Sequence, residues 1–278
     1  MYRLDLSTSV KVTQNFALND DYREDLKEVK RLGFKAVEVS MGGFGNYKMP
    51  MEKAFEVAAD RLQAVLDEGL TLNSVHLPFH RFVYISSCDE DVRAWASDEF
   101  RKLMDICNPF QPKNYVFHSK VGKKEGNVWQ QRKPALIKSF RELVAATDAN
   151  VCMENMVSGY PATIEDMVEV LEQVEGAKCC IDINHFLTDK PEDGIVALSK
   201  WLTTLHITDN DGVYERHWMP KTGVNDWMKI LGALEKIGYK GAFTYEVIKD
   251  PTGRPYTFAE IRENYDQLFE EYNKLRSH

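Results

Sequence analysis

The chain alternates short apolar runs with longer segments of helical periodicity. Eight runs are rich in β-branched and aromatic residues and are bounded by glycine, proline or polar clusters, a pattern typical of buried strands. We expect strands at 3–9, 34–40, 71–79, 114–120, 151–156, 178–184, 203–209 and 242–247.

Apolar residues recur at helical spacing in the gaps between these runs. One such stripe ends just before Gly33, a residue suited to the position after a helix, and another helix is expected to start near Val224. The last helix should begin at Thr257, because Glu260 stands at the spacing of a capping box. Eight strands alternating with helices favour an α/β fold of the (β/α)8 TIM-barrel type, with a single domain over residues 1–278. No GxGxxG follows the first strand, so a dinucleotide fold is disfavoured and no organic cofactor is expected.

Composition narrows the class of protein. The chain has 278 residues, of which 44% are hydrophobic, which suffices for the core of one barrel. A formal charge of −8 and a pI near 5.5 argue against nucleic-acid binding, because affinity for a phosphate backbone comes mainly from lysine and arginine. We find no secretory leader and no membrane-spanning apolar stretch, so a cytoplasmic protein without membrane partners is expected. The oligomeric state stays open, and a homo-oligomer is one of the expected states.

The five cysteines show no CxxC spacing, and three of them lie in apolar, strand-like runs. They are expected to be buried, reduced thiols rather than metal ligands or disulfides.

Acidic and imidazole side chains stand where predicted strands end. Glu154, Asp182 and Glu246 close or follow the fifth, sixth and eighth runs. The carboxyl ends of the strands meet at one face of a TIM barrel, and that face carries the active site. The same rim holds four histidines: His76, His118, His185 and His206. The sequence therefore predicts a divalent-metal site at this face.

These residues resemble the xylose isomerase-like barrels across nearly the whole chain. That family includes sugar and sugar-phosphate isomerases and epimerases, together with the related zinc-dependent apurinic endonucleases. The resemblance rests on Ser-Val-His-Leu-Pro-Phe at His76, Val-Phe-His-Ser at His118, Met-Glu-Asn at Glu154, Ile-Asp-Ile-Asn-His at Asp182 and His185, Leu-His-Ile-Thr-Asp-Asn-Asp at His206, Glu-Arg-His at His217 and Thr-Tyr-Glu-Val at Glu246.

For the isomerase branch, the resemblance implies one divalent ion, either Mn²⁺, Mg²⁺, Zn²⁺ or Co²⁺, and a small sugar or polyol substrate. Glu154 and Glu246 would act as base and acid in a proton transfer through an enediolate. The implied metal ligands are Glu154, Asp182, His206 and Glu246. The implied substrate-binding residues are His76, His118, His185, Arg216, His217 and Lys221.

The endonuclease branch uses the same positions for three zinc ions. It would add His76, His118, His185, Glu215 and His217 to the ligands, with Glu215 standing where that branch has aspartate. Four carboxylates around three divalent ions leave a charge of about +2, which suits a phosphodiester; three around one ion leave about −1, which suits a neutral polyol. The acidic chain has no evident DNA-binding surface, so an isomerase or epimerase is favoured. A barrel that holds metal and sugar without turnover is a third alternative.

Two positions depart from the ketose 3-epimerases. Tyr160 stands where those enzymes carry a second glutamate, and Gly212 stands where they carry an arginine. A free-ketose 3-epimerase is therefore disfavoured.

Three other features carry expectations of their own. Lys221, together with the helix start after it, is a candidate to hold a phosphate or carboxylate of the substrate, although a solvated loop lysine is the commoner explanation of such a residue. Glu38 is either a substrate ligand or a partner for a nearby lysine or arginine, and the second alternative is slightly favoured. The segment 41–51 is expected to form a loop over the mouth of the barrel.

Overall fold

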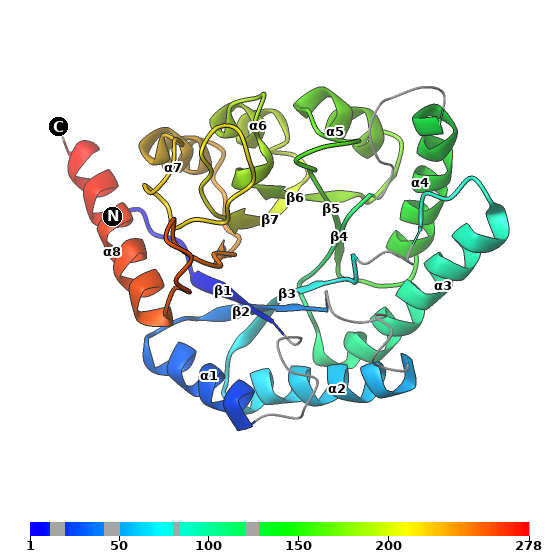
Figure 1. Cartoon of the computed structure of the whole chain (residues 1–278), viewed down its shortest axis with the longest axis horizontal. Coiled ribbons are helices and arrows are strands. Elements are labelled where there is room, and N and C mark those ends of the chain that lie inside the picture. The colour runs from blue at the N-terminus through cyan, green and yellow to red at the C-terminus, as the bar shows by residue number, and fades with distance from the viewer. Residues whose placement is uncertain (12–19, 42–50, 80–83, 120–127, 278) are drawn as a thin grey trace.

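The computed structural model describes residues 1–11, 20–41, 51–79, 84–119 and 128–277. Eight parallel strands close into a barrel in sequence order, with helices around the outside (Figure 1). The predicted (β/α)8 TIM barrel is confirmed. The strands are β1 (Leu6–Lys11), β2 (Ala36–Ser40), β3 (Thr71–His76), β4 (Asn114–Phe117), β5 (Asn150–Glu154), β6 (Lys178–Asp182), β7 (Leu202–Ile207) and β8 (Phe243–Tyr245). The predicted mouth loop lies almost entirely at 42–50, outside the described residues.

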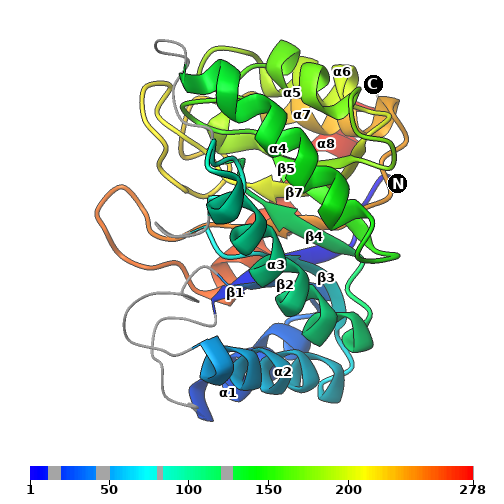
Figure 2. The ribbon, with the colours of Figure 1, turned by 90° about the vertical axis from the view of Figure 1, so that its right-hand side faces the viewer.

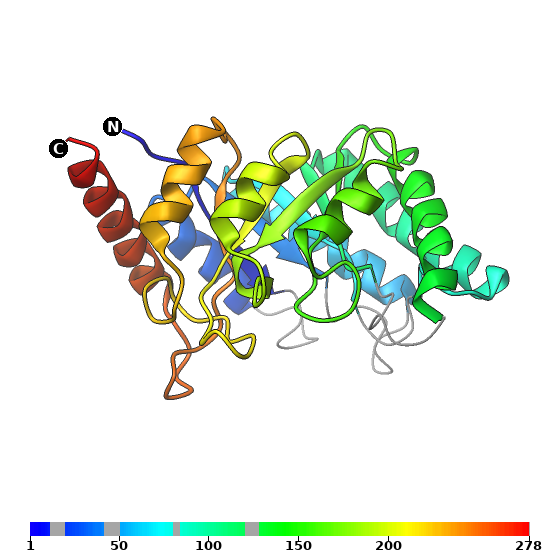
Figure 3. The same cartoon turned by 90° about the horizontal axis from the view of Figure 1, so that it is seen from above.

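A helix follows each strand in the outer layer, as Figure 3 shows from a second direction. The helices are α1 (Asp20–Arg31), α2 (Met51–Asp67), α3 (Glu90–Cys107), α4 (Val128–Val144), α5 (Ile164–Leu171), α6 (Pro191–Ala197), α7 (Trp227–Lys236) and α8 (Phe258–Leu275). Short 3₁₀ turns, η1 (Asn108–Phe110) and η2 (Ile183–His185), follow α3 and β6. The first and last segments meet, because the backbone N–H of Tyr2 donates to Asn273 Oδ1 at 2.8 Å.

The predicted helix ends follow local chemistry. Gly33 adopts a φ of +83° after α1, a conformation that residues with a Cβ adopt at a cost. Thr257 and Glu260 form the predicted capping box of α8.

Predicted boundaries differ from the observed ones by up to three residues; β1, for example, begins at Leu6 instead of 3, and β3 ends at His76 instead of 79. Two other differences have a clear physical reason. The sixth strand stops at Asp182 instead of running to 184, because the Asp182 carboxylate accepts the backbone N–H of Asn184 and starts the η2 turn. The helix predicted near Val224 begins at Trp227, and Asp226 is its N-cap.

The barrel interior is layered. Val116, Cys152 and Cys180 form a small apolar cluster separate from the main core. Side chains alternate along a strand, so each of these residues lies one inward position before a rim residue. On the amino-terminal side of the barrel, Asn73 donates across the interior to the hydroxyl groups of Thr204 and Thr244 at 3.1 and 3.2 Å. By the same alternation, Thr204 and Thr244 lie one inward position before His206 and Glu246. The apolar cluster and these hydrogen-bonded hydroxyl groups therefore belong to one layer behind the rim.

Two irregularities in strand register occur next to rim residues. The pairing of β2 with β3 shifts between Val37 and Glu38, which places Glu38 opposite Ser74. The pairing of β6 with β7 shifts between Cys179 and Cys180, and Asp182 then lies opposite His206. Such bulges re-aim side chains and are frequent beside active sites.

The loops after β7 and β8 extend from the same side of the barrel, in yellow and orange in Figure 2. Asp209 braces the first of these loops from inside. Its fully buried carboxylate accepts six hydrogen bonds. The donors are the backbone N–H groups of Asn210, Lys221, Gly223 and Asn225, the Asn225 amide and the Trp227 indole. The aspartate of the Leu-His-Ile-Thr-Asp motif thus holds the loop in place.

The five cysteines form no disulfide, and Cys88 alone is exposed. The predicted burial is therefore confirmed for the other four. Within the described residues, no helix has the length and apolar character needed to cross a membrane.

Replacing Asp209 with alanine is expected to lower the free energy of unfolding by at least about 3 kcal/mol, because several N–H donors lose one buried acceptor together. Urea unfolding followed by tryptophan fluorescence measures this loss. The matched control is Asp250→Ala, because Asp250 is more exposed and caps a turn after β8. This substitution should lower the free energy of unfolding by about 1 kcal/mol. Equal losses of stability in the two variants would show that the buried hydrogen bonds of Asp209 do not hold the loop in place.

Candidate metal centre

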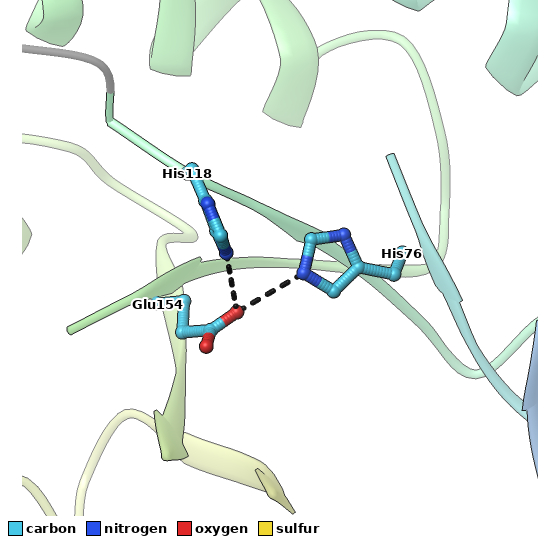
Figure 4. A group of neighbouring side chains, drawn as sticks. All are labelled: His76, His118 and Glu154. Atoms are coloured by element: carbon cyan, nitrogen blue, oxygen red, sulfur yellow. Dashed lines mark hydrogen bonds and ion pairs between the residues drawn. The ribbon is translucent and has the colours of Figure 1, made fainter. Parts of the chain in front are cut away.

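Glu154 is the centre of the rim. It ends β5 and is 1% exposed. Its Oε2 lies 3.2 Å from His76 Nε2 and 3.1 Å from His118 Nε2, so residues of three consecutive strands or strand ends converge on one oxygen (Figure 4). Its Oε1 lies 3.3 Å from His206 Nδ1. His185 Nδ1 lies 3.4 Å from the same Oε1, so the carboxylate faces four imidazoles.

Four predicted ligands converge on one point. His206 Nδ1 lies 3.3 Å from Glu154 Oε1 and 3.1 Å from Glu246 Oε2. One ligand atom from each residue of a four-member set lies within 4.8 Å of those from all the others. That set is Glu154, Asp182, His206 and Glu246.

Asp182 has an unused ligand atom. Its Oδ1 accepts the Asn184 backbone N–H at 2.7 Å and the Thr208 hydroxyl at 3.1 Å. Its Oδ2 is buried and has no hydrogen-bond partner among the described residues, although His185 Nε2 lies 3.4 Å away. A buried carboxylate oxygen without a donor is costly unless a cation satisfies it. Oxygen atoms with one imidazole suit Mn²⁺, Mg²⁺, Zn²⁺ or Co²⁺, so the residues fit a divalent ion.

Four histidines of the rim share one arrangement. Each has one nitrogen at hydrogen-bond distance from an acceptor of the surrounding protein and the other nitrogen facing a carboxylate. The anchoring acceptors are the carbonyls of Leu77 for His76, Asn155 for His185 and Glu246 for His217, and the carboxylate of Glu38 for His206. The anchoring nitrogen must carry a proton, because a carbonyl or carboxylate can only accept. The other nitrogen can face a carboxylate only as a second N–H or with a cation between them.

The pKa values follow from this arrangement. Burial favours neutral histidine, but Asp182, Glu215 and Glu154 raise the pKa of His185 to about 10. Burial also opposes the shift of His217, whose pKa is raised to about 9 mainly by its hydrogen bond to Glu215 and by Glu246. Burial lowers the pKa of His118, which lacks comparable compensation.

The pKa values of the buried carboxyl groups shift in both directions. Burial raises the pKa of Glu154, yet the charges of His206 and His118 hold it well below its usual range. Burial raises the pKa of Asp182, and the neighbouring Glu154 adds to the shift. A divalent ion would replace the imidazolium protons as the balancing positive charge, which is why metal binding releases protons at such sites.

The remaining predicted ligands form a second group at the mouth. Glu215 Oε1 lies 3.3 Å from His185 Nε2 and 2.7 Å from His217 Nε2. His217 adopts a φ of +52°, and its Nδ1 lies 3.0 Å from the carbonyl of Glu246. The structure therefore connects Glu215 and His217 to the strand ends through His185 and Glu246.

Two predicted substrate contacts lie further out. Arg216 Nε donates to Asp211 Oδ2 at 2.6 Å, and its guanidinium lies over the Tyr214 ring at 5.1 Å. Lys221 Nζ lies 2.5 Å from Glu271 Oε2 on α8. Neither side chain has a polar contact with the carboxylates of the rim among the described interactions, and their binding roles remain predictions.

Sequence reasoning missed the role of Glu38. The favoured alternative, a lysine or arginine partner, was wrong, and the alternative of a substrate ligand stays a prediction. Glu38 is fully buried, and its Oε2 lies 3.0 Å from His206 Nε2 and accepts the Ser74 hydroxyl at 2.8 Å. Burial raises the pKa of Glu38, but the charge of His206 outweighs it and holds the pKa at about 2. The only available signal was an acidic residue within an otherwise apolar run.

Asn155 and Phe79 complete the surroundings. The Asn155 amide bridges β5 to β6 through the backbone N–H and carbonyl of Asp182, at 2.8 and 3.1 Å. Phe79 stacks on His118 with ring centroids 5.0 Å apart and contacts His76 edge-on at 5.1 Å. Both residues restrict the orientation of rim side chains.

Comparison with known proteins agrees with this architecture. The family model for the xylose isomerase-like TIM barrel matches residues 26–271. No curated protein sequence matches the chain.

Solved structures share the fold at low sequence identity. A D-tagatose 3-epimerase-like protein aligns with a TM-score of 0.77 and 16% identity over 98% of this chain and 99% of its own. The D-allulose 3-epimerase from Methylomonas sp., solved in complex with D-allulose, aligns with a TM-score of 0.72 and 16% identity over 97% of both chains. A xylose isomerase domain protein from Alicyclobacillus acidocaldarius subsp. acidocaldarius gives 0.71 and 15% over 98% of this chain and 100% of its own.

The raised histidine pKa values predict how stability depends on pH when divalent ions are chelated. Histidines 185 and 217 have ordinary values of 6.5 and folded-state values of about 10 and about 9. Their contribution to stability should be complete below pH 6.5 and should disappear as the pH rises through about 9 and about 10.

Thermal unfolding in the presence of a chelator across this pH window measures the effect. Glu215→Gln should flatten the decline, because it removes the carboxylate shared by both imidazoles. Glu271→Gln, which changes only an exposed ion pair with Lys221, is the control. An unchanged pH profile in the Glu215 variant would contradict the assignment.

Proposed function

The chain belongs to the xylose isomerase-like TIM barrel family, and from that premise we propose that it is a divalent-metal-dependent isomerase or epimerase of a sugar or sugar phosphate. One observation carries the proposal. Ligand atoms of Glu154, Asp182, His206 and Glu246 gather within 4.8 Å of one another at the strand ends, and Asp182 Oδ2 there lacks a hydrogen-bond partner among the described residues.

These four residues would hold one ion. A divalent ion at such a site supplies electrostatic stabilisation of negative charge that develops on substrate oxygens. The protein contributes the fixed orientation of the ligands, because Thr208 and Asn184 hold Asp182 and Glu38 holds His206.

Glu154 and Glu246 would move the proton. Glu154, which ends β5 at the centre of the rim, is 1% exposed, and its carboxylate would accept a proton from a substrate carbon. Glu246, just after β8, has a side chain that is 13% exposed and is therefore more accessible from the mouth. The two carboxylates come from different strands, and a substrate carbon between them could lose a proton to one and regain it from the other. That transfer passes through an enediolate in both isomerisation and epimerisation.

The substrate class follows from the polar groups around these carboxylates. His118 and His185 would bind substrate hydroxyl groups, and Arg216 and Lys221 would contact the far end or a phosphate. The solved D-allulose 3-epimerase supports a sugar as substrate. Tyr160 argues against the same free ketose, because its side chain is fully buried and its hydroxyl donates to Glu169 Oε2 at 2.6 Å.

A trinuclear-zinc phosphodiesterase is the second candidate, and a specific geometry favours it. His76 and His118 share Glu154 Oε2, and His185 and His217 share Glu215 Oε1. Imidazole pairs on shared carboxylates are the arrangement that additional zinc ions would need. The net charge of −8 argues against it, because phosphate backbones are bound mainly through lysine and arginine.

Glu154→Gln and Glu246→Gln should each lower the rate of isomerisation or epimerisation by about 10²–10⁴-fold, because each removes one proton-transfer group. The assay measures turnover of a panel of ketoses, aldoses and their phosphates, with metal content determined for every variant. The exposed Glu175→Gln is the matched control and should retain full activity. Near-normal turnover in either variant contradicts the assignment, and altered affinity without turnover in the unmodified protein would indicate a binding protein.

Metal stoichiometry distinguishes the two enzymatic candidates. Elemental analysis of the purified protein should give about one divalent ion per chain, and His118→Ala should not change it, because the single-ion ligand set excludes His118. Two or three zinc ions, falling when His118 is removed, would overturn the isomerase proposal and favour phosphodiester cleavage.

A further inference from the structure

His206 differs from the other anchored histidines of the rim in what holds it. The anchors of His76, His185 and His217 are backbone carbonyls. The anchor of His206 is the carboxylate of Glu38, with Oε2 at 3.0 Å from Nε2. Both residues are fully buried.

We propose that Glu38 is the positioning residue of the metal centre: by accepting the Nε2 proton of His206, it commits Nδ1 to metal binding. The inference rests on the proposed metal-dependent function and adds a residue outside its predicted ligand set. Metal-binding histidines commonly donate their second ring N–H to a carboxylate, which fixes the tautomer and makes the ligating nitrogen more basic.

The geometry fixes which nitrogen faces the ion. A carboxylate only accepts, so the 3.0 Å contact requires a proton on Nε2. The lone pair of a neutral imidazole is then on Nδ1, the nitrogen that lies 3.3 Å from Glu154 Oε1 and 3.1 Å from Glu246 Oε2. The ligand atom is thereby directed into the carboxylate cluster.

Glu38 is itself held in place. The register shift between β2 and β3 brings Ser74 opposite Glu38, and the Ser74 hydroxyl donates to the same Oε2 at 2.8 Å. The single oxygen that receives His206 is therefore fixed by a second donor from a neighbouring strand.

The cost of this arrangement argues for a function. The other oxygen of Glu38, Oε1, is buried without a hydrogen-bond partner among the described residues. A buried carboxylate that is incompletely paired destabilises a fold compared with an apolar side chain of similar size. Stability does not explain a glutamate at this position, whereas orientation of His206 does.

The test is the affinity for Zn²⁺, measured by chelator competition on the purified, metal-stripped full chain. Glu38→Ala should weaken binding about 10- to 100-fold, the usual effect of removing such a partner. Glu38→Gln should weaken it less, because its carboxamide oxygen can still accept the Nε2 proton. Ser139→Ala is the matched control: Ser139 is a buried polar residue of α4 that bonds to Arg93 and to the carbonyl of Ile85, away from the rim, so binding should be unchanged.

The possible outcomes distinguish failure of the proposed metal centre from failure of the proposed role of Glu38. If the unmodified protein binds no Zn²⁺, the proposed metal centre itself is wrong. If it binds Zn²⁺ and Glu38→Ala binds equally well, the metal centre stands and the role of Glu38 is overturned.

A second measurement needs no variant of Glu38 that could fail to fold. Nitrogen-15 NMR of the Zn²⁺-loaded protein, with the signal assigned by its loss in His206→Gln, should show a protonated Nε2 and a metal-bound Nδ1. Binding through Nε2 would overturn the proposal.

Discussion

Buried carboxylates at the mouth of the barrel need positive charge, and the imidazoles that face them can supply it only in fixed orientations. A ring anchored at one nitrogen presents the other to the carboxylates, as His76 does between the carbonyl of Leu77 and Glu154. Barrel closure, the two register shifts and the braces around Asp182 all serve to hold these opposed groups in place. The same constraint makes the site adaptable, because protons and divalent ions are alternative sources of the required charge.

The sequence predicted the convergence of the site because strand ends share one face of a barrel. Glu154, Asp182 and His206 each stand at or near the end of an apolar run. Eight strands that alternate with helices predict a barrel, and a barrel brings the ends of all its strands to one face. Even a boundary error of two residues at Asp182 did not move it to another face. Rim residues are therefore predictable from pattern alone, whereas the roles assigned to them depend on family resemblance.

Contacts across the barrel and within its loops were not predictable in this way. Pairing of Glu38 with His206 depends on a register shift that apolar periodicity does not record. The late start of α7 depends on Asp209 binding N–H groups up to Asn225 and on Asp226 as the N-cap, although each residue is ordinary for a loop. Lys221 lies beside Glu271, fifty positions later in the chain. Each of these contacts joins segments whose relative position only the folded chain defines.

The cluster of Val116, Cys152 and Cys180 lies directly behind the proposed metal centre. This cluster and the hydroxyl groups bonded to Asn73 together lie between the rim carboxylates and the amino-terminal face of the barrel. In the proposed enzyme, ion and substrate would both approach from the carboxyl-terminal ends of the strands. A bound substrate would then hinder loss of the ion during turnover.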